Sequence, residues 1–295
     1  MKEMEARRVG VVGASGQVGY YLLPRLLAGG ATVAALGRGP RPAHIAAHPR
    51  LLWHQGTLEE GWPDVLPVEY LLSAGPLDTL ARSLEAHWHP HLREVIVLSS
   101  TSIDSKEMSP DPAERALAAQ LVAAEARLRE VCARHNVVLV RIRPTLIYGC
   151  GLDRSLSPLL ARVRRFGVLP LPWPARGLRQ PVHADDLAVL MMICIDRDDL
   201  DGRCFEVGGG ERLSFATMLR RAARAVGRHL VVPVPVSVLR MLLPHMRGAL
   251  SRLSHDLIAH DEEARHLLGW QARCFEPYAG DFENRTEPYV FPDPV

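Results

Sequence analysis

The stretch that decides the fold is RVGVVGASGQVGY, residues 8–20. It predicts a short apolar strand, a glycine turn and a helix that runs to residues 29–30. The glycines follow the spacing G-x-x-G-x-x-G, which allows a sharp turn, close approach of a pyrophosphate and tight packing of the helix on the strand. Free N–H groups at a helix start also favour anions. The turn therefore predicts a dinucleotide site made of Gly13, Ser15, Gly16, Gln17, Val18 and Gly19.

The composition is that of an ordinary globular protein, with 47% hydrophobic residues among 295 and a net charge of +2. This balance gives no electrostatic reason to expect a nucleic-acid partner. The five cysteines lack C-x-x-C spacing, which argues against a disulfide framework or a zinc site and suits a reducing compartment. No window reaches the roughly 18–20 apolar residues of a membrane helix. We expect a cytoplasmic protein with a small-molecule substrate and no membrane span.

Six further apolar segments predict strands that alternate with helices: 31–36, 51–53, 69–73, 94–98, 137–142 and 204–209. Near-continuous apolar strands of this kind are typical of a parallel sheet covered on both faces. We predict an α/β fold, a doubly wound Rossmann sheet of about seven strands. The alanine-rich segment 112–134 predicts a long helix, which could pair across a two-fold axis in a homodimer.

The pattern changes after residue 151. A basic amphipathic helix is expected at 155–166, followed by the proline-rich segment 169–174 and by helices at 213–226, 236–244 and 261–268. These elements predict a small, mostly helical C-terminal cap. We assign residues 1–152 with 181–207 to the dinucleotide-binding domain, and residues 153–180 with 208–295 to the cap. The apolar parts of the cap are expected to pack on their own domain, with a membrane or an apolar substrate as alternatives.

Ligands of parallel sheets bind at the carboxyl ends of the strands. Arg38 ends the second strand, and no Asp or Glu occurs between 31 and 50, which favours the 2′-phosphate of NADP over the ribose of NAD. Small or polar residues end the later strands and extend the predicted cofactor site to Ala74, Gly75, Ser99, Arg143, Pro144 and Thr145. Ser100 and Thr101 follow the fifth strand, where hydroxyls could meet a substrate.

Several motifs in order, taken together, resemble the extended short-chain dehydrogenase/reductase family, the NAD(P)-dependent epimerase/dehydratase group that acts on nucleotide sugars. They are the glycine turn, Ser99-Ser100-Thr101, RPTLIYG at 143–149, RQPVHADDL at 179–187, FEVGG at 205–209 and LGW at 268–270. The resemblance implies an NADP(H) or NAD cofactor and a nucleotide-sugar substrate. It matches Ser100 to a catalytic Ser/Thr, and Arg179 to an arginine that contacts the substrate diphosphate.

The chain departs from that family at its acid/base pair, Tyr-x-x-x-Lys. Leu117 and Leu121 occupy the two positions, and no tyrosine in the chain is followed by lysine four residues later. Three readings stay open. The protein could run redox chemistry with a substitute acid such as Tyr148, His183 or Lys106; it could bind NADP as a regulatory or assembly protein; or it could use the cofactor on a nucleotide-sugar or lipid-linked substrate in another way.

The histidines at 183 and at 87–91 are expected to have structural rather than catalytic or metal-binding roles. His183 precedes Asp185 and Asp186, which are residue types favoured at helix N-caps, so all three are expected to shape a helix start. The alternating His87, His89 and His91 lack a carboxylate or cysteine spaced to complete a metal shell. We predict no metal. The candidate catalytic residues are Ser100, after the fifth strand, and Tyr148, after the sixth.

Overall fold

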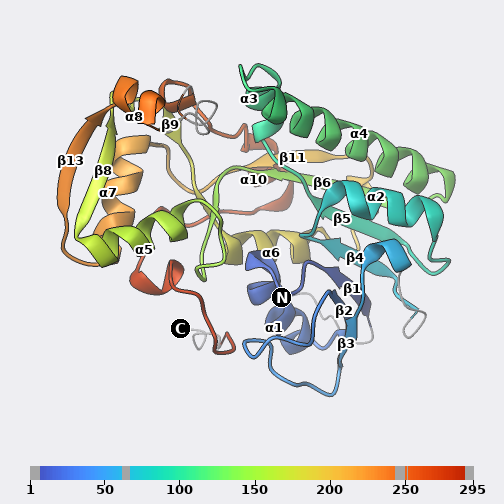
Figure 1. Ribbon diagram of the computed structural model, residues 1–295. Coiled ribbons are helices and arrows are strands. Elements are labelled where there is room, and N and C mark those ends of the chain that lie inside the picture. The colour runs from blue at the N-terminus through green and yellow to red at the C-terminus, as the bar shows by residue number, and fades with distance from the viewer. Residues whose placement is uncertain (1–6, 62–66, 243–249, 251, 290–295) are drawn as a thin grey trace.

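The computed structural model describes residues 7–61, 67–242, 250 and 252–289. Its centre is a seven-stranded sheet in the order β3-β2-β1-β4-β5-β6-β11, and every neighbouring pair is parallel (Figure 1). The strands are β1 Arg8–Val12, β2 Thr32–Gly37, β3 Leu51–Gln55, β4 Tyr70–Ser73, β5 Glu94–Leu98, β6 Val138–Pro144 and β11 Cys204–Val207. The order reverses between β1 and β4, as in doubly wound dinucleotide-binding sheets. The predicted fold class is confirmed.

Helices cover both faces of this sheet, because successive strand residues point to opposite faces and both sets are apolar. One buried cluster joins α1 and α6 to one face, and a second joins α2 and α4 to the other. The bounds are α1 Gln17–Ala28, α2 Leu77–Ala86, α3 Ser102–Glu107, α4 Pro112–Arg134 and α6 Ala184–Cys194. The long predicted helix begins at Pro112 because Asp111 caps it, accepting a hydrogen bond of 2.9 Å from the backbone of Ala113.

The cap lies beside the carboxyl ends of the strands (Figure 1). Its helices α5 and α7 pack around a third apolar cluster. The proline-rich segment forms a strand, β8, which pairs in parallel with β13. The bounds are α5 Leu156–Phe166, β8 Val168–Trp173, α7 Phe215–Ala225, β13 Leu230–Pro235, α8 Val236–Leu242 and α10 Glu262–Leu268.

Short elements complete the chain, namely η1 Leu58–Glu60, β7 Ile147–Tyr148, β9 Leu178–Arg179, β10 Val182–His183, η2 Asp198–Leu200, β12 Leu213–Ser214, η4 Arg252–Ser254 and η5 Ala279–Asp281. After η5 the chain returns to α1, where Tyr20 donates to the carbonyl of Glu287 at 3.2 Å and the rings of Tyr21 and Tyr289 meet edge to face. The division of the chain into two domains stays a prediction. None of the helices in the described ranges is both long and apolar enough to cross a membrane.

Candidate functional site

The glycine turn after β1 lies where the order of the sheet reverses. Gly13 has a φ of +78°, and a Cβ there would lie 2.7 Å from the carbonyl carbon of Ala74 and 2.8 Å from the nitrogen of Gly75. Any side chain at Gly13 would therefore strain its own backbone and collide with the residues after β4. The structure brings these three predicted cofactor residues together at the place where doubly wound sheets bind dinucleotides.

The first turn of α1 is open. Gly16 is the N-cap with a φ of −88°, and no side chain caps the helix. The first N–H groups of a helix have no partner within it, so here they are available to an anion. A Cβ on Gly19 would lie 2.3 Å from the carbonyl oxygen of Ala14. Glycine at this position therefore lets α1 pack directly against the turn.

Gln17 adds a second sign that an anion fits here. Its side-chain Nε2 is shielded from solvent and has no hydrogen-bond partner among the described residues. Buried amide donors are nearly always paired, and a phosphate oxygen at the start of α1 would pair this one. Ser15 beside it is exposed, whereas Val18 is buried in the core. The residues of the turn fit a pyrophosphate.

The end of β2 positions Arg38. A Cβ on Gly37 would lie 2.3 Å from the Trp53 ring, and the indole nitrogen of Trp53 donates to the carbonyl of Gly39 at 3.1 Å. Trp53 therefore fixes the loop on both sides of Arg38, whose side chain is exposed. A guanidinium held on such a loop suits an exposed phosphate, but this assignment stays a prediction.

The ends of β5 and β6 are hydrogen-bonded to each other. Ser99 donates its N–H to Ile142 at 2.7 Å, and the Thr101 hydroxyl donates to the carbonyl of Pro144 at 3.1 Å. Thr145 continues the chain and donates its N–H to Val207 of β11 at 2.9 Å. Ser100 lies between them, with its hydroxyl 2.7 Å from that of Ser102. Residues 99–101 and 143–145 thus form one edge of the candidate site.

A buried carboxylate occupies the centre of this edge. Glu125 on α4 is 3% exposed, and accepts hydrogen bonds from Arg143 at 2.7 and 2.9 Å, from Arg141 at 3.1 Å and from the Ser99 hydroxyl at 2.6 Å. Burial opposes its ionisation, but the hydrogen bonds from Arg143 and Ser99 and the charges of both arginines hold the pKa of Glu125 below its usual value. The side chains of Ser99 and Arg143 are therefore committed to Glu125.

Glu125 was not among the predicted site residues. The sequence carries a signal for it, since Arg141 and Arg143 alternate on a strand that is otherwise apolar. Cations on the buried face of a strand require a counter-charge. The sequence does not say which carboxylate supplies it.

Two leucines lie on the same face of α4 as Glu125. Leu117 and Leu121 precede it by two turns and one turn, so all three side chains point the same way. Leu117 is 41% exposed, whereas Leu121 packs against the apolar cluster under α4. The positions matched to the acid/base pair therefore present an apolar surface that can neither donate nor accept a proton.

Two other predicted site residues are buried. The Tyr148 ring, 1% exposed, packs edge to face on His183 and Phe275, and burial raises the pKa of its phenol. Arg179, 5% exposed, donates to the carbonyls of Leu178 and His255 at 2.7 and 2.8 Å. Both residues hold the cap together in this structure, and their predicted contacts with substrate stay predictions.

His183 is itself the N-cap of α6. Its Nδ1 accepts a hydrogen bond of 3.1 Å from the N–H of Asp185, and its Nε2 lies 3.3 Å from Asp281. The expectation that the aspartates cap this helix is wrong, because Asp185 instead pairs with Arg25 at 2.6 Å and with Arg273 at 2.9 Å. Within the described ranges no three His, Cys, Asp or Glu side chains are grouped to hold a metal ion.

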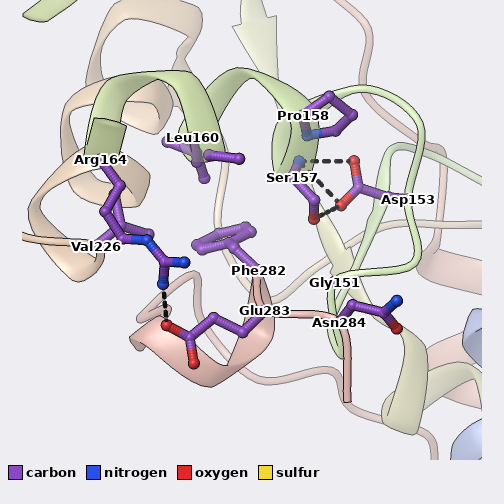
Figure 2. Close-up of a pocket in the computed structure, with 11 residues that line it drawn as sticks. Gly151, Asp153, Ser157, Pro158, Leu160, Arg164, Val226, Phe282, Glu283 and Asn284 are labelled. Carbon is purple, nitrogen blue, oxygen red and sulfur yellow. Dashed lines mark hydrogen bonds and ion pairs between the residues drawn. The ribbon is translucent and has the colours of Figure 1, made fainter. Parts of the chain in front are cut away.

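A hollow of about 490 Å³ lies between α5 and residues 282–284 (Figure 2). Asp153 closes the start of α5 by accepting hydrogen bonds from the N–H groups of Ser155 at 2.9 Å and Ser157 at 3.1 Å. Arg164 pairs with Glu283 across the opposite rim. Because these polar groups satisfy each other, the start of α5 offers an anion far less than the start of α1 does.

Known proteins are similar to this chain in sequence and in architecture. No family model matches the chain. UDP-glucose 4-epimerase of Vibrio cholerae is 27% identical over 151 residues, which is 50% of this chain and 46% of the epimerase. The 3-diazoavenalumate denitrifying reductase of a Streptomyces species is 26% identical over 306 aligned positions, covering 90% of this chain and 95% of the reductase. The predicted resemblance to extended short-chain dehydrogenases/reductases is confirmed.

Among solved structures, MoeE5 in complex with UDP-glucuronic acid and NAD superposes with a TM-score of 0.69 at 18% identity, over 93% of this chain and 97% of MoeE5. This similarity covers the cap as well as the sheet. It supports the Rossmann fold. The match to the UDP-glucose 4-epimerase covers less than half of the epimerase's length, so substrate and activity belong to the proposals below.

Proposed function

We propose that this protein binds a pyridine dinucleotide at the reversal between β1 and β4 and acts as an oxidoreductase or epimerase of nucleotide-sugar-like substrates. The observation that carries this is the cradle formed by Gly13, Ala74 and Gly75 beside the open start of α1. The Nε2 of Gln17, which has no partner among the described residues, supports a phosphate there. The dinucleotide, when bound, supplies hydride transfer.

The residues of this chain would bind and orient that group. The N–H groups of the first α1 turn and Gln17 would bind the pyrophosphate. Arg38 favours NADP, whereas the MoeE5 structure contains NAD, so both nucleotides belong in the test. The half-buried Ser100 and Thr101 at the strand edge would hydrogen-bond a substrate hydroxyl.

One observation favours a second candidate, a non-catalytic NADP-binding regulatory or assembly protein. Proton transfer needs a donor within hydrogen-bond reach of the reacting atom. Leu117 and Leu121 supply none, and Tyr148 and His183 are enclosed. Two candidate proton donors from the sequence remain. Ser100 lies on the edge of the site, and Lys106 lies on α3 beside it.

The first experiment is titration of the full chain with NADPH and NADH, followed by nucleotide fluorescence. We expect binding of both, with NADPH tighter. Gly16→Asp should weaken both at least about 100-fold, because its carboxylate would occupy the start of α1 and repel the pyrophosphate. Ser214→Asp is the matched control, since it also adds a carboxylate at a helix N-cap, that of α7. If neither nucleotide binds, the proposal fails at its first step.

A second measurement separates the two candidates. Protein loaded with NADP⁺ or NAD⁺ is incubated with UDP-glucose and UDP-N-acetylglucosamine, and epimer formation is followed by NMR. Turnover that falls in Ser100→Ala without loss of nucleotide affinity supports the enzyme. Tight nucleotide binding without turnover, and without reduction of either nucleotide, favours the regulatory protein.

A further inference from the structure

The outer side of the cap is an exposed apolar sheet. β8 and β13 pair in register, so Leu230 lies beside Val168 and Val231 beside Leu169. Partners in a parallel pair point to the same side, and sides alternate along each strand. One side holds the buried Leu169 and Leu171. The other, called the outer face here, consists of Val168, Pro170, Pro172, Leu230, Val232 and Val234.

Every residue of the outer face is apolar, although the face looks to solvent. Leu230 is 65% exposed and Val168 and Val232 are each 37% exposed. In Figure 1 the two strands form the edge of the molecule farthest from α4, with α5 and α7 on their inner side. Exposed aromatic rings mark both ends of β8, Phe166 before it and Trp173 at its end, at 66% and 64%. Contiguous apolar surfaces of this kind mark interaction sites.

The chain around the outer face is strongly basic. Residues 154–184 and residues 212–242 contain six arginines each, and neither range contains an aspartate, glutamate or lysine. Three of these arginines, Arg164, Arg212 and Arg221, pair with glutamates elsewhere in the chain. Arg165, in the last turn of α5, and Arg228, in the segment before β13, are both exposed. The N–H of Leu230 at the start of β13 donates to the carbonyl of Gly167 after α5 at 2.7 Å, which brings the two segments together. The charge therefore borders the apolar surface directly.

This combination selects an anionic partner with an apolar interior. A second copy of the chain would bring two arginine-rich caps together, and their like charges would oppose pairing. A nucleic acid would satisfy the arginines but not Val, Leu and Pro side chains that offer no hydrogen bonds. A bilayer with anionic lipids satisfies both, because basic residues bind headgroup phosphates while apolar and aromatic side chains enter the interface.

We propose that the outer face docks the protein on the surface of a membrane that contains anionic lipid. Leu230 and Val232 enter the boundary between headgroups and acyl chains, and Arg165 and Arg228 contact the lipid phosphates. The candidate dinucleotide site lies between β1 and β4 and shares no residue with the outer face, so this proposal stands independently of the proposed function.

The test is co-sedimentation of the full chain with vesicles of phosphatidylcholine alone or with about 30% phosphatidylglycerol. We expect binding to the anionic vesicles, weakened at high salt. Leu230→Glu and Arg228→Glu should each reduce it about tenfold. The matched controls Val122→Glu and Arg129→Glu, both exposed on the distant α4, should bind like the wild type.

Three outcomes would overturn the proposal. The first is no binding to anionic vesicles at low salt. The second is binding reduced equally by the α4 controls, which would reflect net charge alone. The third is wild-type self-association that Leu230→Glu abolishes, or duplex DNA binding that Arg228→Glu abolishes and Leu230→Glu does not, each without vesicle binding.

Discussion

The two halves of the candidate site differ in what their polar groups do. In the half around α1, Gln17 and the first helical N–H groups are left open by the described chain. In the half around α4, the Ser99 hydroxyl and the Arg143 guanidinium bind Glu125, and Leu117 and Leu121 occupy the positions that the sequence resemblance matches to the acid/base pair. The polar groups of the first half are open, whereas those of the second half are paired within the protein.

The two halves also differ in what holds them in place. The α1 half depends on Gly13 and Gly19, where any side chain would collide with neighbouring backbone. The α4 half depends on ion pairs between buried side chains. Each prediction below alters one half and asks whether the other responds.

The largest expected effect is on stability, from Glu125→Gln. The glutamine keeps the volume but leaves Arg141 and Arg143 without their buried counter-charge, so the free energy of unfolding should fall by about 3 kcal/mol. Urea denaturation measures this. Nucleotide binding by the folded variant should stay within about twofold of wild type, because the α1 half is untouched.

The control is Glu130→Gln, an exposed position on the same helix, which should change stability by less than about 0.5 kcal/mol. The pH dependence follows from the lowered pKa of Glu125. Its contribution is present above the unfolded-state pKa of about 4.3 and is lost as pH falls through the folded value. The difference in free energy of unfolding between the wild type and Glu125→Gln should shrink below about pH 4. A difference in free energy of unfolding that is small at neutral pH, or that grows in acid, would contradict the ion-pair account.

The half of the site around α1 could be predicted from the sequence, whereas the half around α4 could not. Residues 8–20 encode strand, turn and helix in one local run, and the apolar segments around them specify the sheet. The Glu125 network joins residues 99, 125, 141 and 143, which become neighbours only through the order of β5, β6 and α4. Alternating arginines indicate that a partner exists, but only the fold identifies it.

The cap shows a second limit of sequence reasoning. Prolines at 170, 172, 233 and 235 argue against strands because proline cannot donate to a sheet ladder. In the structure β8 and β13 are strands of a two-stranded sheet, in which each strand has one side free of ladder hydrogen bonds. Local signals therefore disfavoured an element that tertiary pairing permits.

A smaller effect is expected when the acid/base positions are refilled. Leu117→Tyr should be nearly neutral because Leu117 is 41% exposed, whereas adding Leu121→Lys should lower stability by about 1–2 kcal/mol through lost apolar contact. The new lysine lies one turn from the new tyrosine, so its charge should lower the tyrosine pKa relative to the single variant. Difference absorbance of tyrosinate against pH measures this. Equal titration in both variants would mean that the two positions do not face each other.

The smallest expected effect is on the choice of nucleotide. Arg38→Ala should weaken NADPH binding about tenfold, or about 1.4 kcal/mol, because an exposed guanidinium–phosphate pair is partly screened by water and salt. NADH lacks the 2′-phosphate, so its affinity should stay unchanged, and Arg129→Ala on α4 should affect neither. Fluorescence titration at two salt concentrations checks both points, since only wild-type NADPH binding should weaken with salt through this contact. Equal loss of both nucleotides would show that Arg38 supports the loop beside Trp53 rather than the phosphate, and the open half of the site would then hold NAD and NADP alike.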